Sequence, residues 1–325
     1  MENKIIDLPE MGKVIIISDL HGHLQDFEFI IQKSRLIERL SSNENVYLIV
    51  MGDVCDIERH HFFANYIPPD GDIRILEKLI DLQNKFGKRR IIYIEGNHDF
   101  HILRIFEEFK NSGFSSIEEY VTNYRELYGE MLVANNIAPY DMIYRAKNEY
   151  LEFIGSGPLM VCSKNGIVVV HAGPIRFPEK IPDMKKTINS LKREEHFFAE
   201  PSESYYLQLL CNRYCLSQYT IEDIKNFLNL IDGKIMISGH TPLIHFEEDY
   251  QKFLSGCKLY EGMMIIGNMQ VVLATSFGAY RNQKIYLELD LSKKYESPFE
   301  WKLEKEIFKI PVNTSDTSCP KDFEC

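Results

Sequence analysis

Five short apolar segments of this sequence each end in residues that can bind a metal ion or transfer a proton. Every segment is followed by a motif that combines aspartate, asparagine or histidine with glycine. The motifs are SDLHGH (18–23), GDVCD (52–56), GNHD (96–99), HAG (171–173) and GHT (239–241). One such motif arises often by chance, but five in order along one chain indicate a shared site.

The residue types in these motifs suit a particular kind of metal centre. Carboxylate and amide oxygens together with imidazole nitrogens are the donors that Mn²⁺, Fe and Zn²⁺ accept. A carboxylate can also bridge two ions that lie roughly 3.5–4 Å apart. The sequence therefore predicts a site for divalent metal ions, provided that the fold brings the five motifs together.

The elements that must position these motifs are short strands. Between the first three apolar runs lie amphipathic stretches at 24–40 and 73–87, which predict helices and hence a parallel βαβαβ opening. The carboxyl ends of such strands meet at one edge of a sheet, where ligands collect. Runs rich in β-branched residues predict buried strands at 13–18, 46–51, 89–95, 166–171, 234–239, 269–276 and 284–291.

The remaining chain is predicted to be helical insertions and one hairpin. The segments 101–150 and 185–232 are expected to be helical, and Lys164-Asn165-Gly166 supplies a turn between two strands. No repeat or linker interrupts the chain, so we expect a single domain over 1–310 and a frayed tail over 311–325.

Composition restricts the function classes. The chain has 325 residues, of which 45% are hydrophobic, and a formal net charge of −11, which disfavours nonspecific binding of nucleic acid. No apolar run is long enough for a signal sequence or a membrane span, and the seven cysteines are scattered and odd in number. We therefore expect a cytoplasmic protein with reduced thiols that does not associate with membranes.

The ordered motifs resemble those of the calcineurin-like metallophosphoesterases, from about residue 13 to 290. They are most similar to the phosphoprotein-phosphatase branch, in which GDxHG, GDxxDRG, GNHE, HGG or HAG, and GHT follow one another. The resemblance implies an α/β sandwich of two mixed sheets flanked by helices. It implies two metal ions, one held by Asp19, His21 and Asp53, and the other by Asp53, Asn97, His171 and His240.

The resemblance also implies how the proton and the phosphate are handled. His98 matches the general acid that protonates the leaving oxygen, and Asp56 matches the carboxylate that orients it. The branch places a phosphate-binding arginine where this chain has Ile57. LLCNRY resembles the LLWxR stretch of bacterial relatives, so Arg213 is the better candidate for gripping phosphate, and Arg59 is another.

These features predict a two-metal phosphomonoesterase that acts on a phosphoserine or phosphothreonine protein or on a small phosphate ester. Manganese is the expected ion, with Fe, Zn²⁺ or Mg²⁺ as alternatives. The motif GNHDFHIL is similar to that of symmetrical diadenosine tetraphosphate hydrolases, so hydrolysis of a nucleotide or dinucleoside polyphosphate is the alternative. An inactive binding module is a third reading, which the intact ligand positions disfavour.

Overall fold

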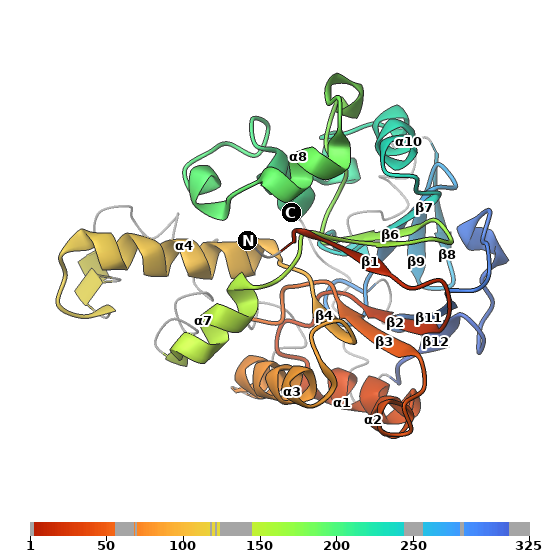
Figure 1. Ribbon diagram of the computed structural model, residues 1–325, viewed down its shortest axis with the longest axis horizontal. Coiled ribbons are helices and arrows are strands. Elements are labelled where there is room, and N and C mark those ends of the chain that lie inside the picture. The colour runs from red at the N-terminus through yellow and green to blue at the C-terminus, as the bar shows by residue number, and fades with distance from the viewer. Residues whose placement is uncertain are drawn as a thin grey trace, which may run out of the picture.

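Two mixed β-sheets lie face to face between two layers of helices in the computed structural model of the chain (Figure 1). This architecture confirms the expected α/β sandwich. The structure describes residues 3–55, 68, 70–117, 119–120, 122–123, 145–243, 256–279 and 283–311. The expected tail lies outside this part of the chain except for Pro311.

The five-stranded sheet contains the parallel opening that the sequence predicts. Strands β2, β3 and β4 are parallel neighbours, and β11 pairs antiparallel with both β2 and β12. In spatial order the strands are β12 (Ile307–Lys309), β11 (Ile285–Asp290), β2 (Lys13–Ile17), β3 (Val46–Val50) and β4 (Ile91–Tyr93).

The seven-stranded sheet combines the later predicted strands with others that the sequence pattern did not reveal. The predicted hairpin is present as β5 and β6, and its turn residue Gly166 has φ +92°. Strands β6, β7 and β10 are parallel neighbours. In spatial order the strands are β1 (Ile5–Leu8), β5 (Met160–Ser163), β6 (Ile167–Val170), β7 (Ile235–Ser238), β10 (Gln270–Leu273), β9 (Met263–Ile266) and β8 (Cys257–Tyr260).

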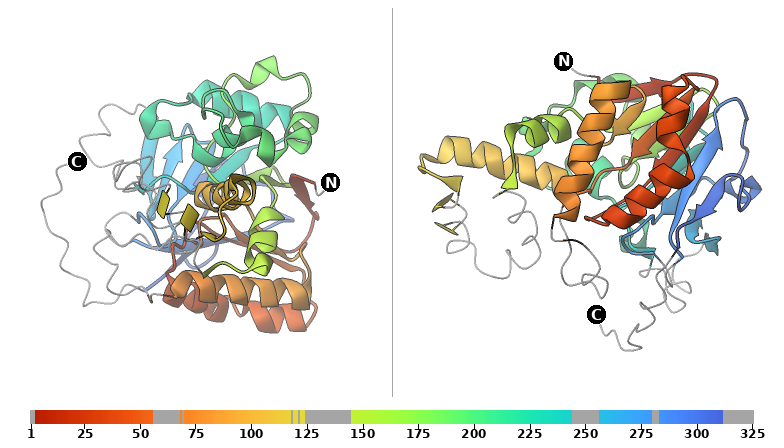
Figure 2. Two further views of the ribbon diagram at one scale, coloured as in Figure 1. Left: turned by 90° about the vertical axis from the view of Figure 1, so that its left-hand side faces the viewer. Right: turned by 90° about the horizontal axis from the view of Figure 1, so that it is seen from below.

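Helices cover the outer face of each sheet (Figure 2). Helices α1 (Leu24–Lys33), α2 (Leu36–Ser41) and α3 (Gly71–Phe86) lie along the five-stranded sheet, whereas α8 (Met184–Ser190), α9 (Tyr205–Cys211) and α10 (Ile221–Leu230) accompany the seven-stranded one. Helix α4 (Asn97–Ser112) extends away from both sheets with α7 (Asn148–Gly155) beside it (Figure 1). Within the described ranges, no helix has both the length and the apolar character needed to cross a membrane.

Burial of both faces of each sheet explains why its strands are apolar throughout. Along β2, Ile15 and Ile17 face the helices, while Val14 and Ile16 face the other sheet. The layer between the sheets is a continuous apolar core that includes Val14, Ile16, Ile49, Val169, Ile237 and Val271. This core fixes the two sheets rigidly against each other, so loops at their ends keep a constant separation.

One predicted helix is divided in two. The stretch 24–40 was expected to be continuous, but α1 ends at Lys33 and α2 begins at Leu36. Arg35 has a left-handed φ of +53°, and the hydroxyl of Ser34 donates to the carbonyl of Ile30. A left-handed residue cannot continue an α-helix, so the chain turns at this point.

Candidate metal centre

The five motifs meet where the ends of β2, β3 and β4 in one sheet face the ends of β6 and β7 in the other. Backbone contacts join them across the two sheets. The N–H of His240 donates to both carboxylate oxygens of Asp19, at 3.0 and 2.9 Å. His171 contacts the carbonyl oxygen of Met51, at the end of β3, through its ring Nδ1. Each sheet therefore contributes side chains to one buried cluster.

Two overlapping sets of side chains in this cluster can each hold a metal ion. In the first set, Asp19, Asp53, His171 and His240 each offer one ligand atom, and these atoms lie within 4.8 Å of one another. In the second set, His21, Asp53 and His98 meet the same criterion. Asp53 belongs to both. The ring of His21 lies edge-on to that of His98, with centroids 5.0 Å apart.

The geometry around His171 fits a metal ion. Its Nδ1 is engaged by the Met51 carbonyl, so the ring presents Nε2 to the cluster. Nε2 lies 3.0 Å from Oδ1 of Asn97 and 3.2 Å from Oδ2 of Asp53. Two ligand atoms that are each about 2.1 Å from one ion are separated by about 3.0–3.4 Å in octahedral or tetrahedral geometry. The donor types and their spacing both match a shared ion.

Close packing of glycines brings these ligands together. A Cβ added to Gly96 would lie only 2.1 Å from Oδ1 of Asp53, and a Cβ on Gly239 would lie 2.2 Å from Oδ2 of Asp19. The same Asp53 oxygen accepts the backbone N–H of His98 at 3.0 Å. Glycine is therefore required in GNHD and GHT because the neighbouring carboxylate occupies the space of a side chain.

The backbone at three of the candidate ligands is strained. His21, Asp53 and His240 have φ values of +40°, +48° and +62°. Residues with a Cβ rarely adopt this conformation, and it persists only where surrounding contacts enforce it. The left-handed backbone conformation at these three residues directs their side chains into the cluster.

The cluster contains buried carboxylates, which a nearby positive charge would stabilise. Burial raises the pKa of Asp19, although His171 opposes the shift. Burial would also raise the pKa of Asp53, but His171 and His98 hold it well below its usual range. Burial would lower the pKa of His171, but Asp53 raises it to about 9. Without a metal ion, the imidazolium of His171 partly compensates the two buried carboxylates.

A further carboxylate beside the cluster has an unusual environment. Oδ2 of Asp99 accepts hydrogen bonds from the Tyr93 hydroxyl and the Gly96 N–H, at 2.7 and 2.9 Å, while its buried Oδ1 has no hydrogen-bond partner. Burial and the nearby Asp53 raise the pKa of Asp99 to about 7. Asp99 thus supports the GNHD turn from behind the candidate ligands.

The structure brings most of the predicted site residues together. His98 lies in the first turn of α4, with Nε2 4.0 Å from Oδ2 of Asp53 and its ring edge-on to His21. Arg213 follows α9 and donates from Nε to Nε2 of His240 at 3.0 Å. Asp56 and Arg59, together with Ile57, lie outside the described residues.

Sequence reasoning missed a polar network directly behind the GNHD motif. Glu95, the residue before Gly96, is completely buried and pairs with Arg193 and with the hydroxyl of Tyr206. A charged residue at the end of the apolar run RRIIYIE was the available signal. Its partner could not be identified from spacing, because Arg193 is 98 residues away.

Comparison with known proteins gives a match to a family model and to solved structures. The family model of calcineurin-like phosphoesterase matches residues 12–243. A cold-active protein-tyrosine phosphatase from Shewanella sp. has a similar structure, with a TM-score of 0.53 and 15% identity over 90% of this chain and 80% of that one. A protein serine/threonine phosphatase from Saccharomyces cerevisiae gives a TM-score of 0.49 with 14% identity, over 88% and 76%.

At 15% identity the Shewanella structure shows similarity of fold alone. No curated protein matched the chain. The family match extends over most of the chain and includes the whole candidate metal cluster, from Asp19 to His240. The chain therefore belongs to the calcineurin-like phosphoesterases and is a metal-dependent phosphoesterase.

Proposed function

We propose that this protein is a phosphomonoesterase of the phosphoprotein-phosphatase type that uses two divalent metal ions. The observation that carries the proposal is the position of Asp53. It is buried at the centre of the cluster and is the only residue shared by the two potential metal-binding sets among the described residues. A carboxylate in this place is suited to bridge two ions.

The residues that would hold the ions are those that the resemblance implies. When bound, two divalent ions supply an activated water and neutralise charge on the phosphoryl oxygens. Oxygen and imidazole donors without thiolate favour manganese, with iron, zinc or magnesium as alternatives. In the grouping that the resemblance implies, one ion would be held by Asp19, His21 and Asp53, and the other by Asp53, Asn97, His171 and His240.

His98 is the proposed general acid. Its side chain is about one-fifth exposed, whereas that of Asp53 beside it is buried. The backbone N–H of His98 is anchored to Asp53, which fixes the start of the helix that carries the ring. This position allows the imidazole to donate a proton to a leaving oxygen. Asp56 is the proposed orienting carboxylate and lies outside the described residues.

Arg213 is the proposed phosphate ligand, and its contact with His240 implies a sequence of events. A neutral imidazole has one lone pair, so its nitrogens cannot accept from Arg213 and ligate an ion at the same time. Ligation of an ion through this nitrogen would therefore break its contact with Nε of Arg213, and would leave the guanidinium, among the described residues, only the 3.4 Å contact from Nη2 to the His240 carbonyl. Phosphate oxygens of a substrate would then be its natural partners, because arginine can hold two of them at once.

The proposed substrates are a phosphoserine or phosphothreonine protein or a small phosphate ester, handled in the cytoplasm. A dinucleoside polyphosphate is the second candidate, favoured by the sequence GNHDFHIL. The two differ in the bond that is cleaved and in the leaving group. Hydrolysis of phosphopeptides, p-nitrophenyl phosphate, its bis ester and diadenosine tetraphosphate with Mn²⁺, Mg²⁺, Fe²⁺ or Zn²⁺ distinguishes them.

A leaving-group comparison tests the assignment of His98. His98→Asn should lower kcat for an alkyl phosphate by roughly 10²–10⁴, because proton donation is lost while metal content is retained. The loss should be much smaller for p-nitrophenyl phosphate, whose leaving group does not need the proton. Equal losses for both substrates would show that His98 has another role.

A further inference from the structure

A buried ion pair lies directly behind the candidate metal centre, between the end of β4 and the helical insertion that contains α9. Glu95 has no exposed surface, and the Arg193 side chain is only 12% exposed. Arg193 donates from Nε and Nη2 to the two carboxylate oxygens of Glu95, at 2.8 and 2.5 Å. It also donates to the carbonyl oxygen of Gly155, at the end of α7.

Tyr206 completes this network from the other side. Its hydroxyl donates to Oε2 of Glu95 at 2.7 Å, and the residue is fully buried. The Tyr206 ring packs against Phe100, with centroids 5.8 Å apart. Phe100 lies in the first turn of α4, which also contains Asn97 and His98. The contacts of Tyr206 therefore reach both ends of the segment from Glu95 to Phe100.

The segment between these two anchors has little freedom. The N–H of Glu95 donates to the carbonyl of Pro158, and Gly96 is packed against the Asp53 carboxylate. One residue further on, Oδ1 of Asn97 lies 3.0 Å from Nε2 of His171. A shift of the Glu95 backbone would move Asn97, because only one glycine separates them.

The desolvation free energy of the Glu95–Arg193 pair indicates that it orients side chains rather than stabilises the fold. Removing two charges from water is expensive, and a buried ion pair is often no more stabilising than apolar side chains of the same volume. A bidentate guanidinium contact, in contrast, fixes both the distance and the orientation of the carboxylate. The network is therefore suited to holding the GNHD turn in one place.

We propose that Arg193 and Tyr206 are positioning residues, which hold Asn97 and His98 in register with Asp53 and His171 through the buried carboxylate of Glu95. The helical insertion that bears Arg193 and Tyr206 thereby sets the geometry of the metal centre. This inference rests on the proposed metal ligands, although it is independent of the substrate.

Mn²⁺ affinity of the purified protein, measured by isothermal titration calorimetry at 25 °C, tests the inference without reference to activity. Removal of a side chain that orients a metal ligand typically lowers metal affinity by about 10–100-fold. We expect Arg193→Met to weaken the Asn97-containing site at least tenfold. Tyr206→Phe, which removes one hydrogen bond at nearly constant volume, should weaken it several-fold.

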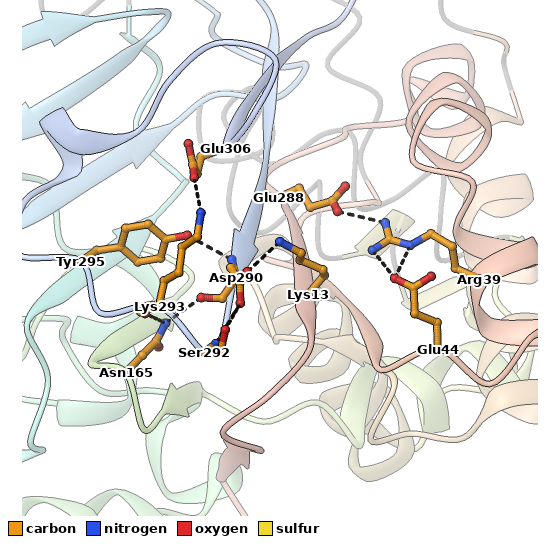
Figure 3. Close-up of polar contacts among 10 residues, drawn as sticks. All are labelled: Lys13, Arg39, Glu44, Asn165, Glu288, Asp290, Ser292, Lys293, Tyr295 and Glu306. Carbon is orange, nitrogen blue, oxygen red and sulfur yellow. Dashed lines mark hydrogen bonds and ion pairs between the residues drawn. The ribbon is translucent and has the colours of Figure 1, made fainter.

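Arg39, in α2, provides a matched control, and Figure 3 shows its contacts with Glu44 and Glu288. Its side chain is 16% exposed, and it donates to Glu44, Glu288 and the carbonyl of Ser34. These partners lie on or beside α1, α2 and β11, none of which carries a candidate ligand. We expect both Arg39→Met and Arg193→Met to lower the Tm, but only Arg193→Met to weaken Mn²⁺ binding.

A conservative variant separates geometry from charge and keeps the test informative if Arg193→Met does not fold. Arg193→Lys retains the charge but cannot reach both carboxylate oxygens in the same way. We expect the Mn²⁺ affinity of Arg193→Lys to lie between that of the wild type and that of Arg193→Met. If Arg193→Met does not fold, the affinity of Arg193→Lys should still lie below that of the wild type. Wild-type affinity in both Arg193→Lys and Tyr206→Phe would overturn the inference. Failure of the wild-type protein itself to bind Mn²⁺ would instead overturn the proposed function.

Discussion

Replacing Gly96 by alanine should disable the metal centre while leaving the backbone unstrained. Gly96 has φ −101° and ψ 174°, an extended conformation that alanine adopts freely. The new Cβ would lie 2.1 Å from Oδ1 of Asp53, 2.7 Å from its backbone nitrogen and 2.8 Å from its Cγ. The substitution therefore acts on one residue, Asp53, through one methyl group.

The size of the effect follows from the required displacement. Contact becomes ordinary at 3.4 Å, so the carboxylate oxygen and the methyl group must separate by about 1.3 Å. Asp53 is held by its positive φ and by the N–H of His98, so the turn at Gly96 must share the movement. A misplacement of about 1 Å at a reacting site can cost about 10²-fold in rate. We expect kcat/KM of Gly96→Ala to fall at least that far.

Steady-state hydrolysis of p-nitrophenyl phosphate, with metal content measured on the same sample, provides the assay. Gly113→Ala is the control, because Gly113 ends α4 with φ +78° and has open space around it. That variant should lose stability, by about 1 kcal/mol, but not activity. If Gly96→Ala retains activity within threefold of the wild type, the close packing of Asp53 against this turn is not required.

Three further predictions concern single side chains. Asp53→Asn should reduce activity to background and release one or both metal ions, because both potential sets lose their shared carboxylate; two retained ions per chain with normal turnover would contradict this. Arg213→Ala should lower kcat/KM by roughly ten- to a hundredfold without weakening Mn²⁺ binding, since the guanidinium competes for His240 and then binds phosphate; weaker Mn²⁺ binding would show that Arg213 supports the ligand instead. Burial lowers the pKa of His101 to about 4, so the folded state binds fewer protons than the unfolded chain between about pH 4 and 6.5. Stability should therefore fall as pH drops through this window. The upper limit is about 3.5 kcal/mol, because the two pKa values differ by about 2.5 and each pKa unit corresponds to about 1.4 kcal/mol. Denaturant titrations of His101→Gln should show a flatter pH dependence.

Most central strands could be predicted from the sequence because they are buried on both faces and are therefore apolar throughout. The runs at 13–18, 46–51 and 234–239 are apolar throughout, and each became a central strand of a sheet. Strands β1 and β12 were missed because they are only four and three residues long and lie at the edges of their sheets. Such short segments take their conformation from the neighbouring strand with which they pair.

The sequence by itself determined which residue types stand at the strand ends, because a strand and the motif that follows it are local features. The order of these motifs was enough to predict the family and a metal-binding cluster. Only the tertiary structure shows which side chains meet, with Nε2 of His171 close to Asp53 and Asn97 and the ring of His21 beside that of His98. It also placed Arg213 against His240 and Arg193 against Glu95. Such contacts depend on how two sheets and a helical insertion pack together, and packing sums many long-range interactions that leave no periodic signal in the chain.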